Sequence, residues 1–156
     1  MAGPINQAHE IVARVWYGGD DAVAAGIALY FDADYGTVAD NDASRINIVE
    51  KPPSAASSLN FAGISKGSYR AVTGGQFVDI YCPGSRGVPL QLEGGIDSVN
   101  NLTTLMAVKT TGTWTDTTEE GRGVAYARSS KDAATPGALC IADLLTGDGA
   151  PFTIAS

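Results

Sequence analysis

Short apolar runs recur along the chain, and each is bounded by Gly, Pro, Asp or Asn. In chain order the runs are AGIALYF, FAGISKGSYRAVTGGQFVDIYC, RGVPLQL, GRGVAYAR and GALCIADLL. β-branched and aromatic side chains are frequent in them, which is typical of short strands joined by tight turns. The pattern predicts an all-β protein, a compact β-sandwich or β-barrel of about ten short strands.

Alternation inside two of the runs predicts which side chains face the core. Residues 10–17, EIVARVWY, alternate with a period of two, which favours a strand over the alternative of two helical turns. Residues 76–82, QFVDIYC, have one aliphatic face that is suited to the core and one face with aromatic and acidic side chains. The aliphatic face consists of Val78, Ile80 and Cys82, and the opposite face consists of Phe77, Asp79 and Tyr81.

Glycine-rich segments predict the connections between strands. SKG, TGG and PGS separate NFAGI, SYRAV, QFVDIYC and RGVPLQL, which predicts consecutive hairpins. Gly26 marks a bulge or a close approach of the backbone. TTLMAVKT favours a strand over a short helix through its Thr and Val content, and TGTWTDTTEEGRG is expected to be a long polar loop. The last third predicts two strands joined by an exposed turn through residues 131–137.

The chain divides into a short arm and one domain. Residues 1–9 predict an extended N-terminal arm, either a frayed terminus or a segment that docks on a neighbouring subunit. Residues 10–156 are expected to form a single β domain. A chain of 156 residues buries about 70% of its unfolded surface, so its core requires no disulfide or metal ion.

Charge and composition exclude some partners. Ten basic and 17 acidic residues give a net charge of −7, and no cluster of Lys and Arg occurs, which argues against a nucleic-acid partner. The chain is 44% hydrophobic and only 17% charged. This composition fits either a Gly/Ala/Thr-rich β protein or a surface partly covered by a partner. No leader and no membrane-length apolar run is evident, so we expect no membrane association and a reducing compartment.

Candidate chemistry is sparse. GGDD at residues 18–21 is expected to be a turn, and the four aspartates of Asp32–Asp42 a solvated acidic turn, with a Ca²⁺ site as the alternative. His9 is the single histidine and has no Ser or Cys motif that would indicate a triad. Cys82 and Cys140 lie in apolar runs and are expected to be buried free thiols, although pairing stays open. We expect no enzyme activity, no metal ion and no cofactor.

Most of the chain resembles a known family. FAGIS…YRAVTGGQFVDIYCPGSRGVPLQL and GRGVAYARSSKDAATPGALCIADLL are similar to the small capsid decoration (cement) proteins of tailed bacteriophages, and AVAAGIALYFD is similar to their early strand. The resemblance covers residues 22–145. It implies a β-barrel or β-sandwich body, often trimeric, seated at local threefold positions on the capsid exterior after synthesis in the host cytoplasm.

The resemblance also implies a function and a partner. A structural virion protein of this kind binds the major capsid protein and stabilises contacts between neighbouring shell subunits as a homotrimer. The candidate contact residues are Ile5, Asn6 and Gln7 of the arm and the aromatics Trp114, Trp16 and Tyr17, which are expected to be exposed on loops. A place in the core is the alternative for Trp16. A head spike or a glycan- or receptor-binding surface module is the alternative function, and a single histidine makes a small hydrolase a poor third.

Overall fold

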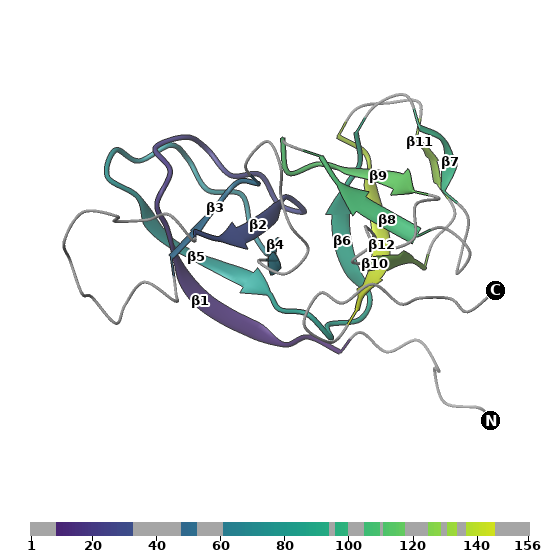
Figure 1. Cartoon of the computed structure of the whole chain (residues 1–156), viewed down its shortest axis with the longest axis horizontal. Coiled ribbons are helices and arrows are strands. Elements are labelled where there is room, and N and C mark those ends of the chain that lie inside the picture. Colours follow the sequence, from purple (N-terminus) through teal and green to yellow (C-terminus); the bar gives the residue numbers. More distant parts are fainter. Residues whose placement is uncertain are drawn as a thin grey trace.

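The fold is all-β, as predicted. The computed structural model describes residues 9–32, 48–52, 61–93, 96–99, 105–109, 111–117, 125–128, 131–133 and 137–145. These ranges contain twelve strands and no helix, and therefore no helix that could cross a membrane. Ten of the strands form two five-stranded sheets, one of them a closed barrel, which lie side by side in Figure 1.

The first half of the chain forms the barrel. Its strands close in the order β1-β3-β2-β4-β5, with β1 and β3 parallel and the other pairs antiparallel. The strands are β1 (Val12–Tyr17), β2 (Ala28–Phe31), β3 (Ile48–Glu50), β4 (Phe61–Ser65) and β5 (Gln76–Tyr81). The predicted alternation is confirmed in β1 and β5, because Val15, Tyr17, Val78 and Ile80 are buried inside the barrel and Cys82 packs against them.

The second half of the chain forms the open sheet, whose strands lie in the order β6-β12-β10-β8-β9. They are β6 (Val88–Gln91), β12 (Leu139–Leu144), β10 (Ala125–Ala127), β8 (Leu105–Val108) and β9 (Trp114–Thr117). A separate two-stranded sheet joins β7 (Ile96–Val99) and β11 (Lys131–Ala133). The strand in TTLMAVKT and the two strands of the last third are confirmed. The prediction of a long polar loop in TGTWTDTTEEGRG is wrong at β9, and the prediction of a turn through residues 131–137 is wrong at β11.

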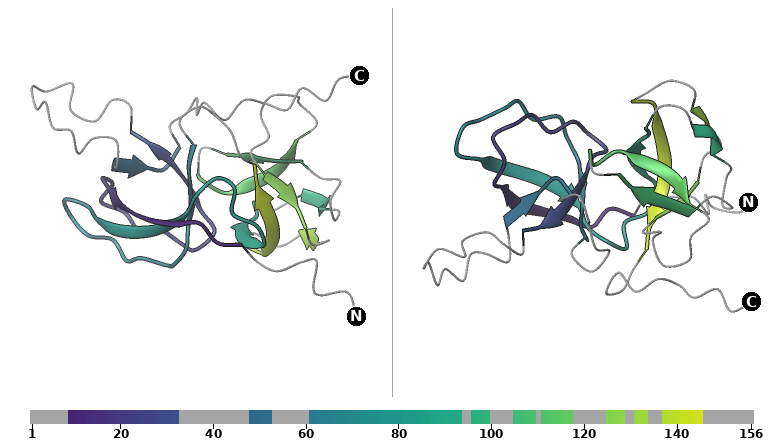
Figure 2. Two further views of the ribbon diagram at one scale, coloured as in Figure 1. Left: turned by 90° about the horizontal axis from the view of Figure 1, so that it is seen from below. Right: turned by 45° about the horizontal axis from the view of Figure 1, so that its top comes forward.

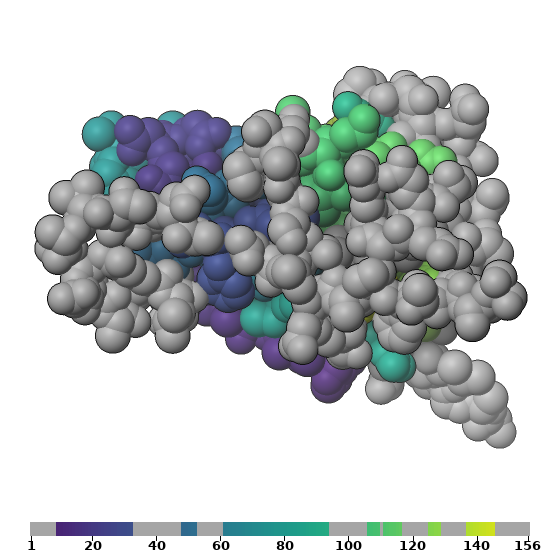
Figure 3. All heavy atoms as spheres, in the orientation of Figure 1, coloured from purple at the N-terminus to yellow at the C-terminus, as the bar shows by residue number. Residues whose placement is uncertain are grey.

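A shared core joins the barrel to the open sheet. Side chains of β2, β4 and β5 pack against the inner face of the open sheet in the larger hydrophobic cluster. The backbone also crosses between the two sheets, because the Ala28 amide donates to the Gly112 carbonyl at 2.9 Å and the Gln91 amide donates to the Gly26 carbonyl at 3.0 Å. In Figures 2 and 3 the purple and blue barrel and the green strands of the open sheet form adjoining halves of the molecule.

Gly26 lies at the junction of the two sheets, where its carbonyl accepts a hydrogen bond from the Gln91 amide. Its φ is +84°, and a Cβ built on it would lie 2.6 Å from the Gln91 amide nitrogen. No side chain fits in that space, so the predicted close approach of the backbone is confirmed.

The predicted series of hairpins is wrong at two points. SYRAV contains no strand, and its β-pairing is limited to an isolated bridge between Tyr69 and Val23. PGS does not close a hairpin, because β5 belongs to the barrel and β6 belongs to the open sheet. The buried Ser85 fixes this crossing by accepting a hydrogen bond from the Ile11 amide at 3.0 Å and donating to the Ile11 carbonyl. A turn motif fixes the local reversal of the chain but not the sheet that the next strand joins.

Candidate contact surface

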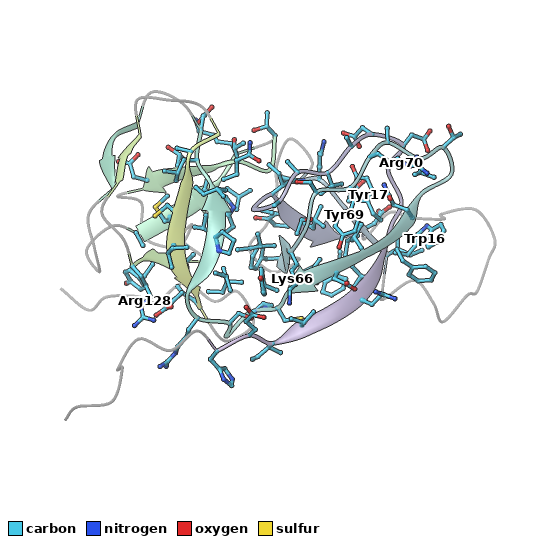
Figure 4. The ribbon with its side chains drawn as sticks, turned by 180° about the vertical axis from the view of Figure 1, so that it is seen from behind. Trp16, Tyr17, Lys66, Tyr69, Arg70 and Arg128 are labelled. Atoms are coloured by element: carbon cyan, nitrogen blue, oxygen red, sulfur yellow. The ribbon has the colours of Figure 1, made fainter. Side chains whose placement is uncertain are left out.

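The outer faces of β1 and β5 form a strip of three cross-strand pairs. Tyr81 lies opposite Val12, Asp79 opposite Arg14 and Phe77 opposite Trp16. These six residues, which we call the outer strip, occupy the alternate positions to those that fill the barrel, so the pleat directs their side chains out of the barrel. Tyr81 is buried there in the core shared with the open sheet, and the other five residues lie at the surface or are partly exposed. Figure 4 shows Trp16 at the end of β1 that lies farthest from the open sheet.

An aromatic pair forms the far end of the outer strip. Phe77 is 62% exposed, and Trp16 is half-buried beside it. The two rings meet edge to face, with centroids 4.9 Å apart and planes at 85°. This arrangement is favourable for aromatic rings because the positive edge of one meets the negative face of the other.

A glycine turn supports the Trp16 ring from behind. A Cβ on Gly75 would lie 2.8 Å from Trp16 Nε1 and 2.5 Å from the Tyr17 carbonyl oxygen, so the ring packs where a side chain is missing. The preceding Gly74 amide donates to the Asp20 carboxylate at 2.8 Å. The first aspartate of GGDD therefore anchors the turn on which the aromatic pair rests.

Ion pairs balance the charges along the strip and at its border. Arg14 donates to both carboxylate oxygens of Asp79, at 2.8 Å and 3.2 Å. The hydrogen bond and the charge of Arg14 lower the pKa of Asp79, and Asp79 in turn raises the pKa of Arg14. Lys66 pairs with Glu10 at 3.1 Å, and its ammonium lies 5.3 Å from the centre of the Tyr81 ring. No group within the strip is left as an isolated charge.

Asp21, the second aspartate of GGDD, links Tyr17 in the barrel interior to Lys51, which directly follows β3. Asp21 accepts hydrogen bonds from the Tyr17 hydroxyl and from Lys51, whose ammonium also donates to the Ala22 carbonyl at 2.9 Å. Partial burial acts to raise the pKa of Asp21, but the bonds from Lys51 and Tyr17 outweigh it and the pKa is lowered. Burial and the bond to Asp21 raise the pKa of Tyr17. GGDD thus forms a bend, as predicted for a turn, and both of its carboxylates accept hydrogen bonds that hold neighbouring segments in place.

Two of the three aromatic candidates are not exposed. Tyr17 is 2% exposed, because it faces the barrel interior, so the expectation that it lies exposed on a loop is wrong. Trp114 is fully buried in β9, with its Nε1 donating to the Gly26 carbonyl at 3.0 Å and its ring edge-on to Phe61. The Thr neighbours of Trp114 lie on the opposite face of the strand, so a polar sequence concealed a core position. Trp16 is partly exposed, but it lies on a strand.

The structure bears on the other candidate residues as follows: some lie outside the described residues, and His9 and the two cysteines lie within them. Ile5, Asn6 and Gln7 of the arm lie outside the described residues, as does the acidic segment beyond Asp32. His9 is exposed and makes a backbone bridge to Arg86. Neither cysteine forms a disulfide: Cys140 is buried, while Cys82 is half-buried and its pKa is raised by burial. The described residues contain no cluster of His, Cys, Asp or Glu that would hold a metal ion.

Phe77 is the most exposed large apolar residue of this surface, and it is not among the contact residues predicted from the sequence. The signal was present, because the alternation in QFVDIYC placed Phe77 opposite the aliphatic core face. A large aromatic residue on the face of a strand that avoids the core is a candidate for a contact surface.

A smaller apolar patch lies on the outer face of the open sheet. Leu139 is 49% exposed and Ile141 is 40% exposed, and they pair across β12 and β6 with Gln91 and Pro89. This patch contains no aromatic pair. Within the described part of the chain, this patch and the outer strip lie on different sheets, and of the two the outer strip combines aromatic rings with paired charges.

The topology defines a class of all-β proteins in which a closed five-stranded barrel packs on an open five-stranded sheet. No protein family and no curated protein sequence matches the chain. Among solved structures it is similar to the N base of the head fiber gp8.5 in bacteriophage phi29, with a TM-score of 0.51 and 12% sequence identity. The match covers 92% of this chain and 98% of that chain. At this identity the likeness is one of fold.

Proposed function

We propose that this chain is a structural protein of a bacteriophage head that binds the outer surface of the shell and stabilises contacts between neighbouring major capsid subunits. The observation that carries the proposal is the likeness of fold to the base of a phage head fiber, over 92% of this chain. The likeness extends through both sheets. The resemblance of the sequence to capsid decoration proteins points to the same setting.

The physical character of the described surface supports this role. The outer strip offers exposed aromatic area and balanced charges, which suits contact with another protein better than contact with a polyanion. A decoration protein requires only a modest contact per copy, because many copies act together on one shell. We propose a homotrimer with the major capsid protein as its partner, and no catalytic activity or cofactor.

A second candidate is the base of a head fiber or spike. The observation that favours it is the described role of the structural neighbour, which is itself a head fiber base. In that role the same fold would attach a projecting structure to the head, and the number of copies would follow the number of fibers. The two candidates share an attachment surface and differ in copy number.

The test is the copy number of this chain in purified phage particles, measured by quantitative mass spectrometry against the major shell protein. We expect a ratio near one to one for a decoration protein. A few copies per particle would favour the fiber base, and absence of the chain from the particle would overturn both candidates. Sedimentation equilibrium separately tests the trimer, and a monomer at high concentration would contradict the oligomeric state alone.

A further inference from the structure

We infer that the outer strip is the surface that docks on the shell, and that its partner is an apolar, weakly charged patch on the exterior of the major capsid protein. This inference rests on the proposed function and names the contact within it. It assigns the central role to Phe77 and Trp16 rather than to Trp114 or Tyr17.

The available area favours a shell over a second copy in a simple dimer. With Phe77 62% exposed, Val12 45% exposed and Trp16 half-buried, the strip exposes on the order of 250 Å² of apolar surface. An interface of standard size buries about 450 Å² of apolar area on each partner. The strip alone is too small for a stable dimer, but it suffices for a weak contact that is repeated over a lattice.

The charges define the chemistry of the partner. The chain carries a net charge of −7, but Arg14 is matched by Asp79 and Lys66 is matched by Glu10. The strip is therefore a neutral region on an acidic protein. A partner patch with few charges meets it without like-charge repulsion, whereas a strongly charged patch would have to break the existing ion pairs.

The aromatic pair is held in place before any partner arrives. The Trp16 ring packs over Gly75, whose turn is anchored by Asp20, and Phe77 lies edge-on against it. Side chains that are already ordered lose little conformational entropy on binding. Aromatic residues in this state are typical of the residues that dominate protein interfaces.

The experiment measures binding of purified full-length chain to phage shells that lack it. Phe77→Ser removes the exposed ring, and Leu139→Ser is the matched control, since Leu139 is an exposed apolar residue of similar exposure on the other sheet. We expect Phe77→Ser to reduce the affinity for shells at least tenfold, Leu139→Ser to change it less than twofold, and Phe77→Leu to restore part of the loss. Circular dichroism and the melting temperature confirm that each variant is folded.

A second measurement tests the apolar nature of the contact. Binding of the unmodified chain should persist when salt is raised from about 0.1 M to about 0.5 M, because screening weakens charge contacts but not apolar ones. Loss of binding in high salt would overturn the assigned partner chemistry.

The outcomes separate this inference from the proposed function. If the unmodified chain fails to bind shells, the proposed function fails. If it binds and Phe77→Ser binds equally well, the function stands and the docking surface is wrong. If Phe77→Ser instead abolishes self-association of the free chain, the strip belongs to a contact between copies, and the inference is overturned.

Discussion

The barrel and the open sheet solve the problem of strand edges in different ways. The barrel closes on itself through the pairing of β1 with β5, so its backbone has no free edge. The open sheet ends at β6 and β9. On β6 the Gln91 amide points away from β12 and donates to the Gly26 carbonyl. Backbone N–H groups alternate in direction along a strand, so the nitrogen of Pro89, two residues earlier, also lies on the side away from β12. Proline has no N–H there to donate to a further strand. Proline on an edge strand discourages pairing with a further strand.

The difference also appears in the cores. The barrel encloses a cluster of its own, with Val15, Leu29, Val49, Val78 and Ile80 inside. The open sheet has its buried side chains in the cluster that it shares with the barrel wall. The open sheet therefore depends on the barrel for its stability more than the barrel depends on it. Of the outer strip, Tyr81 belongs to this shared cluster, whereas Val12 and Phe77 remain exposed.

The largest expected effect comes from Trp114, which lies between the two sheets. Trp114→Ala should lower the free energy of unfolding by about 3–5 kcal/mol, because it removes the largest buried ring of the shared core and the hydrogen bond to Gly26. Hydrogen exchange should show β10 and β12 losing protection before β1 and β5. Chemical denaturation gives the size of the loss.

Trp16→Ala is the control for this prediction, because it removes the same side chain from the barrel exterior. It should cost about 1–2 kcal/mol, less than Trp114→Ala, since Trp16 is partly exposed and makes no hydrogen bond between the sheets. Equal losses for the two variants, or loss of protection in the barrel first, would contradict the asymmetry between the sheets.

The next largest effect on stability comes from Gly26, and a comparison with Gly74 tests how tightly the two sheets pack at their junction. Gly26 and Gly74 have almost the same φ, +84° and +85°. A Cβ on Gly26 would clash with the Gln91 backbone, whereas a Cβ on Gly74 would have nothing within 4 Å. Gly74→Ala should cost about 1 kcal/mol from the backbone conformation alone, and Gly26→Ala about 2 kcal/mol more.

Thermal denaturation of the two glycine variants checks this difference. Since both positions carry the same conformational cost, the difference between the variants isolates the contact between the sheets. Similar melting temperatures for Gly26→Ala and Gly74→Ala would show that the junction tolerates a side chain.

The smallest effect is a dependence of barrel stability on pH. Because the pKa of Asp21 is lowered in the folded state, its contribution is present above the ordinary pKa of an aspartate and is lost as the pH falls through the folded value. Asp21→Asn should therefore lower stability at neutral pH and change it little under acid conditions. Unfolding curves at a series of pH values measure the two slopes, and parallel curves for variant and unmodified chain would contradict the prediction.

The candidate surface was only partly predictable from the sequence. The period of two in β1 and β5 separated the core faces from the outer strip correctly, since that separation depends only on the pleat. It placed Phe77 and Tyr81 on the same face, but it did not reveal that Tyr81 is buried while Phe77 is left exposed, because exposure depends on which segments cover each face. Trp114 shows the limit most clearly: its polar neighbours describe one face of β9, and the barrel that covers its other face is far away in sequence.

The sequence by itself determined the all-β class, the positions of strands such as β1, β5, β8 and β12, and the close backbone approach at Gly26. These features follow from side-chain alternation and glycine geometry, which act over a few residues. Only the tertiary structure decided that β1 pairs with β3 in parallel, that the chain leaves the barrel after β5, and that Trp114 is buried against Phe61. These outcomes depend on contacts between distant segments, which are selected by the packing of the whole core rather than by local preference.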